Sequence, residues 1–106
     1  TQDKNKKRGA STKTATTQFN LDTFAKADFR AARYVIAMSE GSNYHSTEIV
    51  LVHDGSTVTM TQYGTLKNTN VATFDADINS GNVRVKATPS SSSSTTFKIS
   101  KTLTKV

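Results

Sequence analysis

Residues 47–63 read TEIVLVHDGSTVTMTQY, and this stretch decides the fold. Two runs rich in β-branched residues flank Asp54-Gly55, and this arrangement is the strongest short-range signal of a β-hairpin. Thr47–His53 is the most apolar run in the chain and predicts a central strand buried on both faces. In the run after the turn, Val58 and Met60 alternate with polar residues, which predicts that both point towards a core.

Similar runs, separated by polar turns, occupy most of the chain. The tight turn at residues 79–82 precedes the run VRVKAT, in which Val83, Val85 and Ala87 alternate with polar residues and are expected to point inward. The strands that we expect are Phe19–Leu21, Arg33–Ser39, Thr47–His53, Thr57–Tyr63, Val71–Ile78, Val83–Thr88 and a last one through Phe97 and Ile99.

The segment before the first strong strand lacks this alternation. Its aromatic residues Phe24 and Phe29 are five positions apart. Asp22 or Thr23 is expected to cap a short helical turn there, because both residue types accept a hydrogen bond at a helix start. We expect this turn to pack the two phenylalanines on the sheet.

The composition favours β-structure in a single domain. The chain has 106 residues, which fits one domain. Hydrophobic residues make up 34% of it, below the usual ~45–50%, and Thr and Ser fill the gap. About seven strands with two apolar faces predict an all-β fold, namely a small antiparallel two-sheet β-sandwich, Ig-like or jelly-roll-like. A small barrel is the main alternative.

Residues 1–17 differ in character from the rest of the chain. They contain no apolar residue larger than Ala, so they cannot bury enough surface to offset the entropy of ordering. We expect a flexible arm at 1–17 and a β-sandwich domain at 18–106. Most of the formal net charge of +6 belongs to the arm, which carries five basic side chains and one acidic side chain, Asp3. These basic residues are Lys4, Lys6, Lys7, Arg8 and Lys13.

The charge of the arm has two interpretations. Clustered Lys and Arg can bind nucleic acid by releasing counterions from the phosphates. The body, however, shows no basic stripe interleaved with aromatic residues, so we do not expect a nucleic-acid partner. We expect instead that the arm docks on an acidic neighbouring subunit.

The residue types that carry catalysis or bind metals form no recognisable constellation. Residues 75–81 resemble the start of a calcium loop, but Ser80 and Lys86 stand where an EF-hand needs Gly and Glu. His53 beside Asp54 lacks an identifiable nucleophile, and the chain has no Cys and no Gly-rich phosphate loop. We therefore expect no enzyme, no cofactor and no metal. No apolar run approaches the ~18 residues of a membrane span, so no membrane partner is expected.

Three polar loops are candidates for ligand binding, at residues 41–44, 64–70 and 90–94. Sugar sites often combine an aromatic face with nearby amide groups, and Tyr44 beside Asn43 would suit this. The alternative for Tyr44 is an ordinary strand tyrosine that packs its ring and hydrogen-bonds its hydroxyl. The candidate ligand residues are Asn43, Tyr44, Lys67, Asn68 and Asn70.

Four pieces of the sequence together resemble a known β-module. They are Phe-Arg-x-Ala-x-Tyr at 29–34, Tyr-x-Ser-x-Glu-Ile at 44–49, Val-His-Asp-Gly at 52–55 and Gly-Asn-Val-Arg at 81–84. The combination resembles a module of structural proteins in tailed bacteriophages, especially T4-like phages of cyanobacteria and other marine bacteria. The resemblance covers most of residues 20–99 and leaves out the arm.

The resemblance implies a virion structural component and supplies no catalytic residues. The first hypothesis is assembly, in which the domain joins the capsid surface, neck or tail, and the arm docks on another virion protein. The alternative is host recognition, in which the exposed loops bind a glycan on the bacterial surface, as in a tail fibre. A homo-oligomer is compatible with both, because edge strands can pair between chains.

Overall fold

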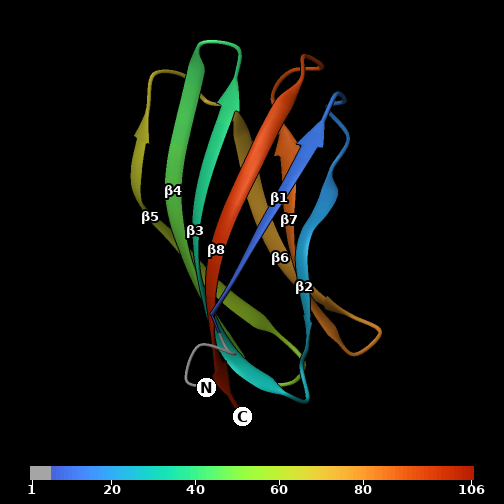
Figure 1. Cartoon of the computed structure of the whole chain (residues 1–106). Coiled ribbons are helices and arrows are strands. Elements are labelled where there is room, and N and C mark those ends of the chain that lie inside the picture. Colours follow the sequence, from blue (N-terminus) through green and yellow to red (C-terminus); the bar gives the residue numbers. More distant parts are fainter. Residues whose placement is uncertain (1–5) are drawn as a thin grey trace.

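The computed structural model describes the backbone of residues 6–106 and the side chains of residues 8–106. Within this part of the chain all regular structure is β-strand (Figure 1). The strands are β1 (Lys6–Lys13), β2 (Phe19–Ala25), β3 (Phe29–Glu40), β4 (Asn43–His53), β5 (Val58–Lys67), β6 (Ala72–Asn79), β7 (Asn82–Pro89) and β8 (Thr95–Lys105).

The strands form two antiparallel sheets that face each other (Figure 1). The larger sheet has the order β1-β8-β3-β4-β5, and the smaller one has the order β2-β7-β6. This arrangement confirms the two-sheet sandwich expected from the sequence. It has eight strands where about seven were expected, and the additional strand comes from the arm.

Strand β1 corrects the expectation that the whole of residues 1–17 is a flexible arm outside the domain. Residues 6–13 pair with β8 over eight positions, from Lys6 opposite Thr102 to Lys13 opposite Thr95. Backbone hydrogen bonds form this ladder, and they do not depend on apolar side chains. An argument from the missing apolar residues therefore does not detect an edge strand of this kind.

The core lies between the sheets and is filled from both. In β7, Val83, Val85 and Ala87 point inward as expected from their alternation, and all three are buried. Other fully buried side chains come from β3, β4 and β8, among them Tyr34, Ile36, Ile49, Leu51 and Phe97.

Both predicted hairpins form. The Asp54-Gly55 turn joins β4 to β5, and Asp54 Oδ1 accepts hydrogen bonds from Ser56 N (2.9 Å) and Thr57 N (2.8 Å). These donors hold the pKa of Asp54 below its usual value. The β6–β7 turn places Ser80 and Gly81 at φ angles of 52° and 83°, the positive values that tight hairpin turns require.

Two local predictions were wrong. Residues 22–25 belong to β2 and not to a helical turn, and a register shift beside Leu21 carries the strand across a bulge. Strand β4 is not buried on both faces, because Val50 and Val52 lie on the outer face and are exposed. A continuous run of β-branched residues can therefore form a strand that is buried on one face only, because the exposed face can also carry valines. No helix among residues 6–106 is long and apolar enough to cross a membrane.

Candidate ligand-binding end of the sandwich

Three connections between strands meet at one end of the sandwich (Figure 1). The β3–β4 turn, the β5–β6 connection and the β7–β8 loop all lie there. We call this region the loop end and define it as residues 41–44, 66–70 and 90–94. It contains all five ligand candidates expected from the sequence, so residues up to 27 positions apart in the chain share one surface.

Asn68 ties the β5–β6 connection to the start of β4. Its Oδ1 accepts a hydrogen bond from Tyr44 N (2.8 Å), and its own backbone N donates to Tyr44 O (3.2 Å). Its Nδ2 also reaches Ser42 O at 3.5 Å. The amide of Asn68 therefore positions Tyr44 and has little capacity left to bind a ligand itself.

Asn70 joins two more parts of the loop end in the same way. Its Oδ1 accepts from Lys67 Nζ (3.4 Å), and its Nδ2 donates to Ser90 Oγ (3.1 Å). Ser90 N in turn donates to Val71 O at 2.9 Å. Asn43 Nδ2 makes a comparable contact with Glu40 Oε1 at 3.3 Å. These amides hold the loops in one arrangement, which lowers the entropic cost of binding a ligand.

The side chains best placed to contact a ligand together are those of Tyr44 and Leu66. Lys67 pairs with buried His45 in the ladder, so it lies on the opposite face of the sheet. Tyr44 is 58% exposed and Leu66 is 72% exposed. Position 44 is directly opposite Asn68 and near Leu66 at the end of the β4–β5 ladder. An exposed aromatic ring with an aliphatic neighbour suits a ligand that has an apolar face.

Buried His45 lies beneath this surface. Its Nδ1 accepts a hydrogen bond from Val71 N at 3.2 Å, so its proton sits on Nε2, which has no hydrogen-bond partner among the described residues. Burial, and then the positive charge of Lys67, lower the pKa of His45. His45 is thus a neutral support for the β5–β6 connection.

Of the five basic side chains of the arm, the structure describes those of Arg8 and Lys13. Lys4 lies outside the described residues, and Lys6 and Lys7 enter the ladder with β8 through their backbone. Arg8 is exposed opposite Ser100. Lys13 differs from the others, because its Nζ lies 4.6 Å from the centroid of the Phe19 ring.

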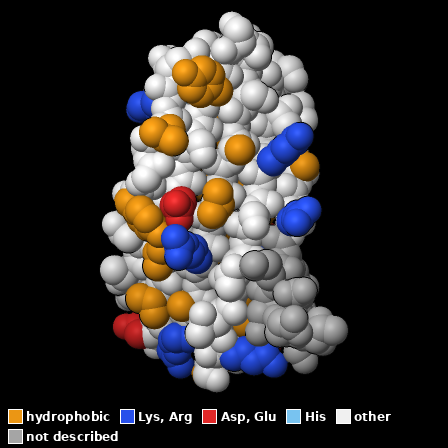
Figure 2. All heavy atoms as spheres, turned by 60° about the vertical axis from the view of Figure 1, so that its left-hand side comes forward, with side chains coloured by type: hydrophobic (Ala, Val, Ile, Leu, Met, Phe, Trp, Pro, Cys, Tyr) orange, Lys and Arg blue, Asp and Glu red, His pale blue; other side chains and the backbone are white. Residues whose placement is uncertain are grey.

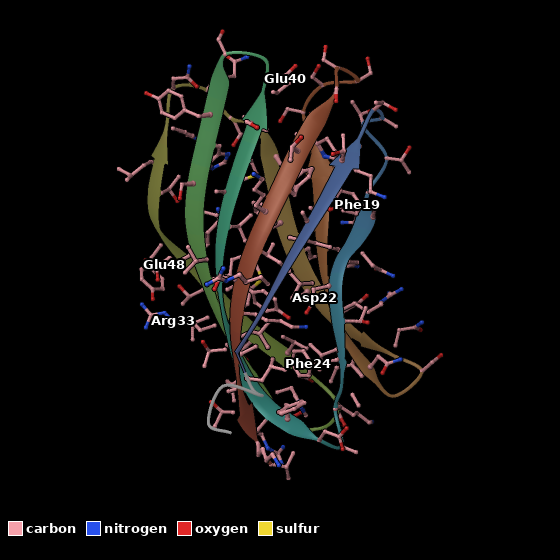
Figure 3. The ribbon with its side chains drawn as sticks, in the orientation of Figure 1. Phe19, Asp22, Phe24, Arg33, Glu40 and Glu48 are labelled. Carbon is pink, nitrogen blue, oxygen red and sulfur yellow. The ribbon has the colours of Figure 1, made fainter. Side chains whose placement is uncertain are left out.

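The outer face of the larger sheet carries a cluster that sequence reasoning missed. Arg33 donates to Glu48 Oε1 through Nε (3.2 Å) and Nη2 (2.8 Å), and Tyr63 donates to the same oxygen (3.2 Å). Arg33 and Glu48 lie together on the outside of the sheet (Figure 3). The hydrogen bonds lower the pKa of Glu48 and raise that of Arg33. Alternation along β3 and β4 is the sequence signal that would have indicated this cluster.

Exposed hydrophobic side chains surround this cluster. Figure 2 shows hydrophobic groups spread over this face, with charged groups between them. Val35, Val50 and Val52 belong to it, and a shallow apolar cavity of about 250 Å³ lies between β4 and β5. Among the described residues, no three His, Cys, Asp or Glu side chains are grouped to hold a metal ion.

The fold is similar to segments of solved bacteriophage tailspike proteins. A solved tailspike protein of Acinetobacter phage vB_ApiP_P1 matches 98% of this chain with a TM-score of 0.54 and 18% identity. The fold is similar to that of a tailspike segment. The tailspike of Acinetobacter baumannii phage AM24 matches 96% of this chain with a TM-score of 0.50 and 11% identity.

The chain spans only about a quarter of these tailspikes, 23% of the first and 26% of the second. At such identities the similarity concerns the fold alone. No family model matches the sequence, and no curated protein matches it.

Proposed function

We propose that this chain is a domain of a bacteriophage tail protein, carried on the virion, that binds a glycan on the surface of the bacterial host. Its role in this proposal is binding and not catalysis. The loop end is the proposed binding surface, with Tyr44 and Leu66 as contacts. The narrower resemblance to T4-like phages of cyanobacteria and other marine bacteria remains a prediction from the sequence.

The observation that carries this proposal is an exposed tyrosine at the end of the sandwich where the three polar loops lie. The Tyr44 ring offers an apolar face to a sugar, and its hydroxyl can donate to and accept from the sugar's hydroxyl groups. Asn68 and Asn70 hold the surrounding backbone, as their hydrogen bonds show. The similarity of fold to tailspike segments supports a place in the phage tail.

Virion assembly is the second candidate, and strand β1 favours it. Among the described residues the strand pairs with β8 alone, which leaves its other edge for another chain. The side chains that it carries from Arg8 to Thr12 are mostly exposed. A basic edge strand of this kind could join a neighbouring virion protein whose edge is acidic.

The experiment is binding of the purified domain to host cells and to their extracted surface glycan. Tyr44→Ala should reduce binding about fivefold or more, since ring stacking on a sugar contributes on the order of 1 kcal/mol or more. Tyr63→Ala is the matched control, because Tyr63 is also exposed on the outer face but lies opposite Glu48, further along the sheet from the loop end. Equal losses in both variants, or none in Tyr44→Ala, would contradict the loop end as the site.

Deletion of residues 1–13 separates the two candidates. If assembly is the role, particles carrying the shortened protein should lack it, although the domain still folds. If host binding is the role, incorporation should persist and glycan binding should remain.

A further inference from the structure

A polar groove lies on the outer side of the smaller sheet, apart from the loop-end contacts described above. It measures about 300 Å³, the lower end of the range for small-molecule sites, and its walls come from the start of β2 and from β7. We call it the β2–β7 groove. It is lined by Gln18, Phe19, Asn20, Arg84 and Lys86.

Two cations on β7 form one wall of the groove. Arg84 binds Asp77 of β6 with two hydrogen bonds, Nε to Oδ1 at 2.7 Å and Nη2 to Oδ2 at 2.6 Å. Lys86 Nζ donates to the same Oδ2 at 2.9 Å. Two positive charges therefore share one carboxylate, and a second acid of β6, Asp75, lies opposite Lys86 in the ladder.

The shared carboxylate also fixes both cations in place. Arg84 uses Nε and Nη2 on Asp77, and Lys86 uses one of its protons, so both keep N–H donors for another acceptor. The side chain of Lys86 is only 16% exposed, which restricts its conformations. A ligand would thus meet donors that are already ordered.

A third cation contacts Phe19 but is not among the residues that line the groove. Lys13 from β1 places its Nζ 4.6 Å from the ring centroid of Phe19, and that ring packs edge-on against Phe97 in the core at 5.2 Å. The remaining nearby acid is Asp75, which is exposed opposite Lys86 on β6. Since β6 and β2 flank β7 on opposite sides, Asp75 lies away from the β2 wall.

We propose that the β2–β7 groove binds a carboxylate-bearing sugar unit of a glycan. The carboxylate lies between Arg84 and Lys86, which supply charge-assisted hydrogen bonds. The amides of Gln18 and Asn20 face the hydroxyl groups, because an amide both donates and accepts, as a hydroxyl does. A volume of about 300 Å³ suits a sugar ring and is too small for a helix or a nucleic-acid backbone track.

This proposal goes beyond glycan binding at the loop end and can succeed or fail independently of it. The two sites share no residue. Residue-resolved shifts in an NMR titration distinguish them, because ligand at the groove perturbs Asn20 and Lys86, and ligand at the loop end perturbs Tyr44 and Asn68.

The test is a titration of the ¹⁵N-labelled domain with methyl β-glucuronide, in parallel with methyl β-glucoside and with sodium sulfate. We expect saturable shifts at Asn20, at Arg84 Nε–H and at Lys86 with the glucuronide, and weaker shifts with the other two probes. Lys86→Gln should weaken glucuronide binding about tenfold, as expected for one charge-assisted hydrogen bond. Lys86→Arg keeps the charge and should retain binding.

Lys98→Gln is the matched control, because Lys98 is an exposed cation of β8 outside the groove. Equal affinity for glucoside and glucuronide would overturn the role of the carboxylate. Equal affinity for sulfate would reduce the groove to a simple anion site. Equal weakening by Lys98→Gln would show that only net charge matters, and an absence of shifts at the groove would reject the site.

Discussion

The hydroxyl of Tyr34 donates a hydrogen bond of 2.7 Å to Asp22 Oδ2, and this contact joins the two sheets through the interior. Tyr34 belongs to β3 of the larger sheet and is fully buried, and Asp22 belongs to β2 of the smaller one. Lys101 Nζ of β8 donates to the same oxygen, also at 2.7 Å. Figure 3 shows Asp22 between the sheets. Burial, and then the hydrogen bond to Asp22, raise the pKa of Tyr34, so the hydroxyl stays protonated.

Tyr34→Phe should destabilise the domain by roughly 1.5–3 kcal/mol, the usual worth of a hydrogen bond to a charged group. The carboxylate of Asp22 would retain Lys101 and lose its other partner. Urea unfolding followed by circular dichroism measures the change. Tyr44→Phe is the control, and it should alter stability by less than about 0.5 kcal/mol because Tyr44 is exposed. Similar effects in both variants would contradict a bridging role for Tyr34.

The ion pairs of Asp77 should make stability depend on pH in acid. Hydrogen bonds from Arg84, and then from Lys86, lower the pKa of Asp77 to about 2. The unfolded chain has the ordinary value of about 3.9, so this contribution is complete above about pH 4 and is lost as the pH falls towards about 2.

Asp77→Asn should remove that part of the acid dependence. The loss at neutral pH should be roughly 1 kcal/mol or less, because the side chain of Asp77 is 35% exposed and solvent screens the pairs. Urea midpoints of both proteins between pH 6 and pH 2 measure it, and parallel curves would argue against the assignment. Other acids, such as Asp54, titrate in both proteins and cancel in the difference.

His45 should make the stability of the domain depend on pH closer to neutrality. The pKa of His45 is lowered in the folded domain. Below the ordinary value of about 6.5, the histidine therefore binds a proton more readily in the unfolded chain than in the folded domain. Stability is therefore complete above that pH and falls as the solution becomes more acidic. His45→Asn keeps an acceptor for Val71 N and should flatten the dependence between pH 7.5 and 5.5. An unchanged slope would show that His45 is protonated as easily in the fold as outside it.

Substitution by Ala should change the stability of the domain in opposite directions at Gly81 and at Gly9. Gly81 has a φ of +83° in the β6–β7 turn, so Gly81→Ala should cost about 1 kcal/mol or more. Gly9 of β1 has no such φ, and an added Cβ would lie 3.4 Å from Ile99 Cγ1, beside a cavity of about 130 Å³. Gly9→Ala should be neutral or stabilising by up to about 0.5 kcal/mol. Thermal unfolding of the pair measures this, and an equal loss at both sites would contradict it.

The sequence alone determined the elements whose signals are local. The Asp54-Gly55 and Ser80-Gly81 turns were predictable, because few residue types tolerate the backbone angles of a tight hairpin. The inward face of β7 followed from strict alternation. Strand β1 of the arm was not predictable in this way. It is held by backbone pairing with β8, and no side-chain pattern in residues 6–13 indicates that pairing.

The candidate sites show the same division. The sequence indicated Tyr44, Asn68 and the other loop residues as separate candidates, and the tertiary structure decided that their loops meet and that Asn68 supports Tyr44. The β2–β7 groove was not predictable, because it needs Gln18 and Lys86 side by side, 68 positions apart in the chain. The physical reason is that turn and strand preferences act between neighbouring residues, and sheet order decides which distant side chains meet.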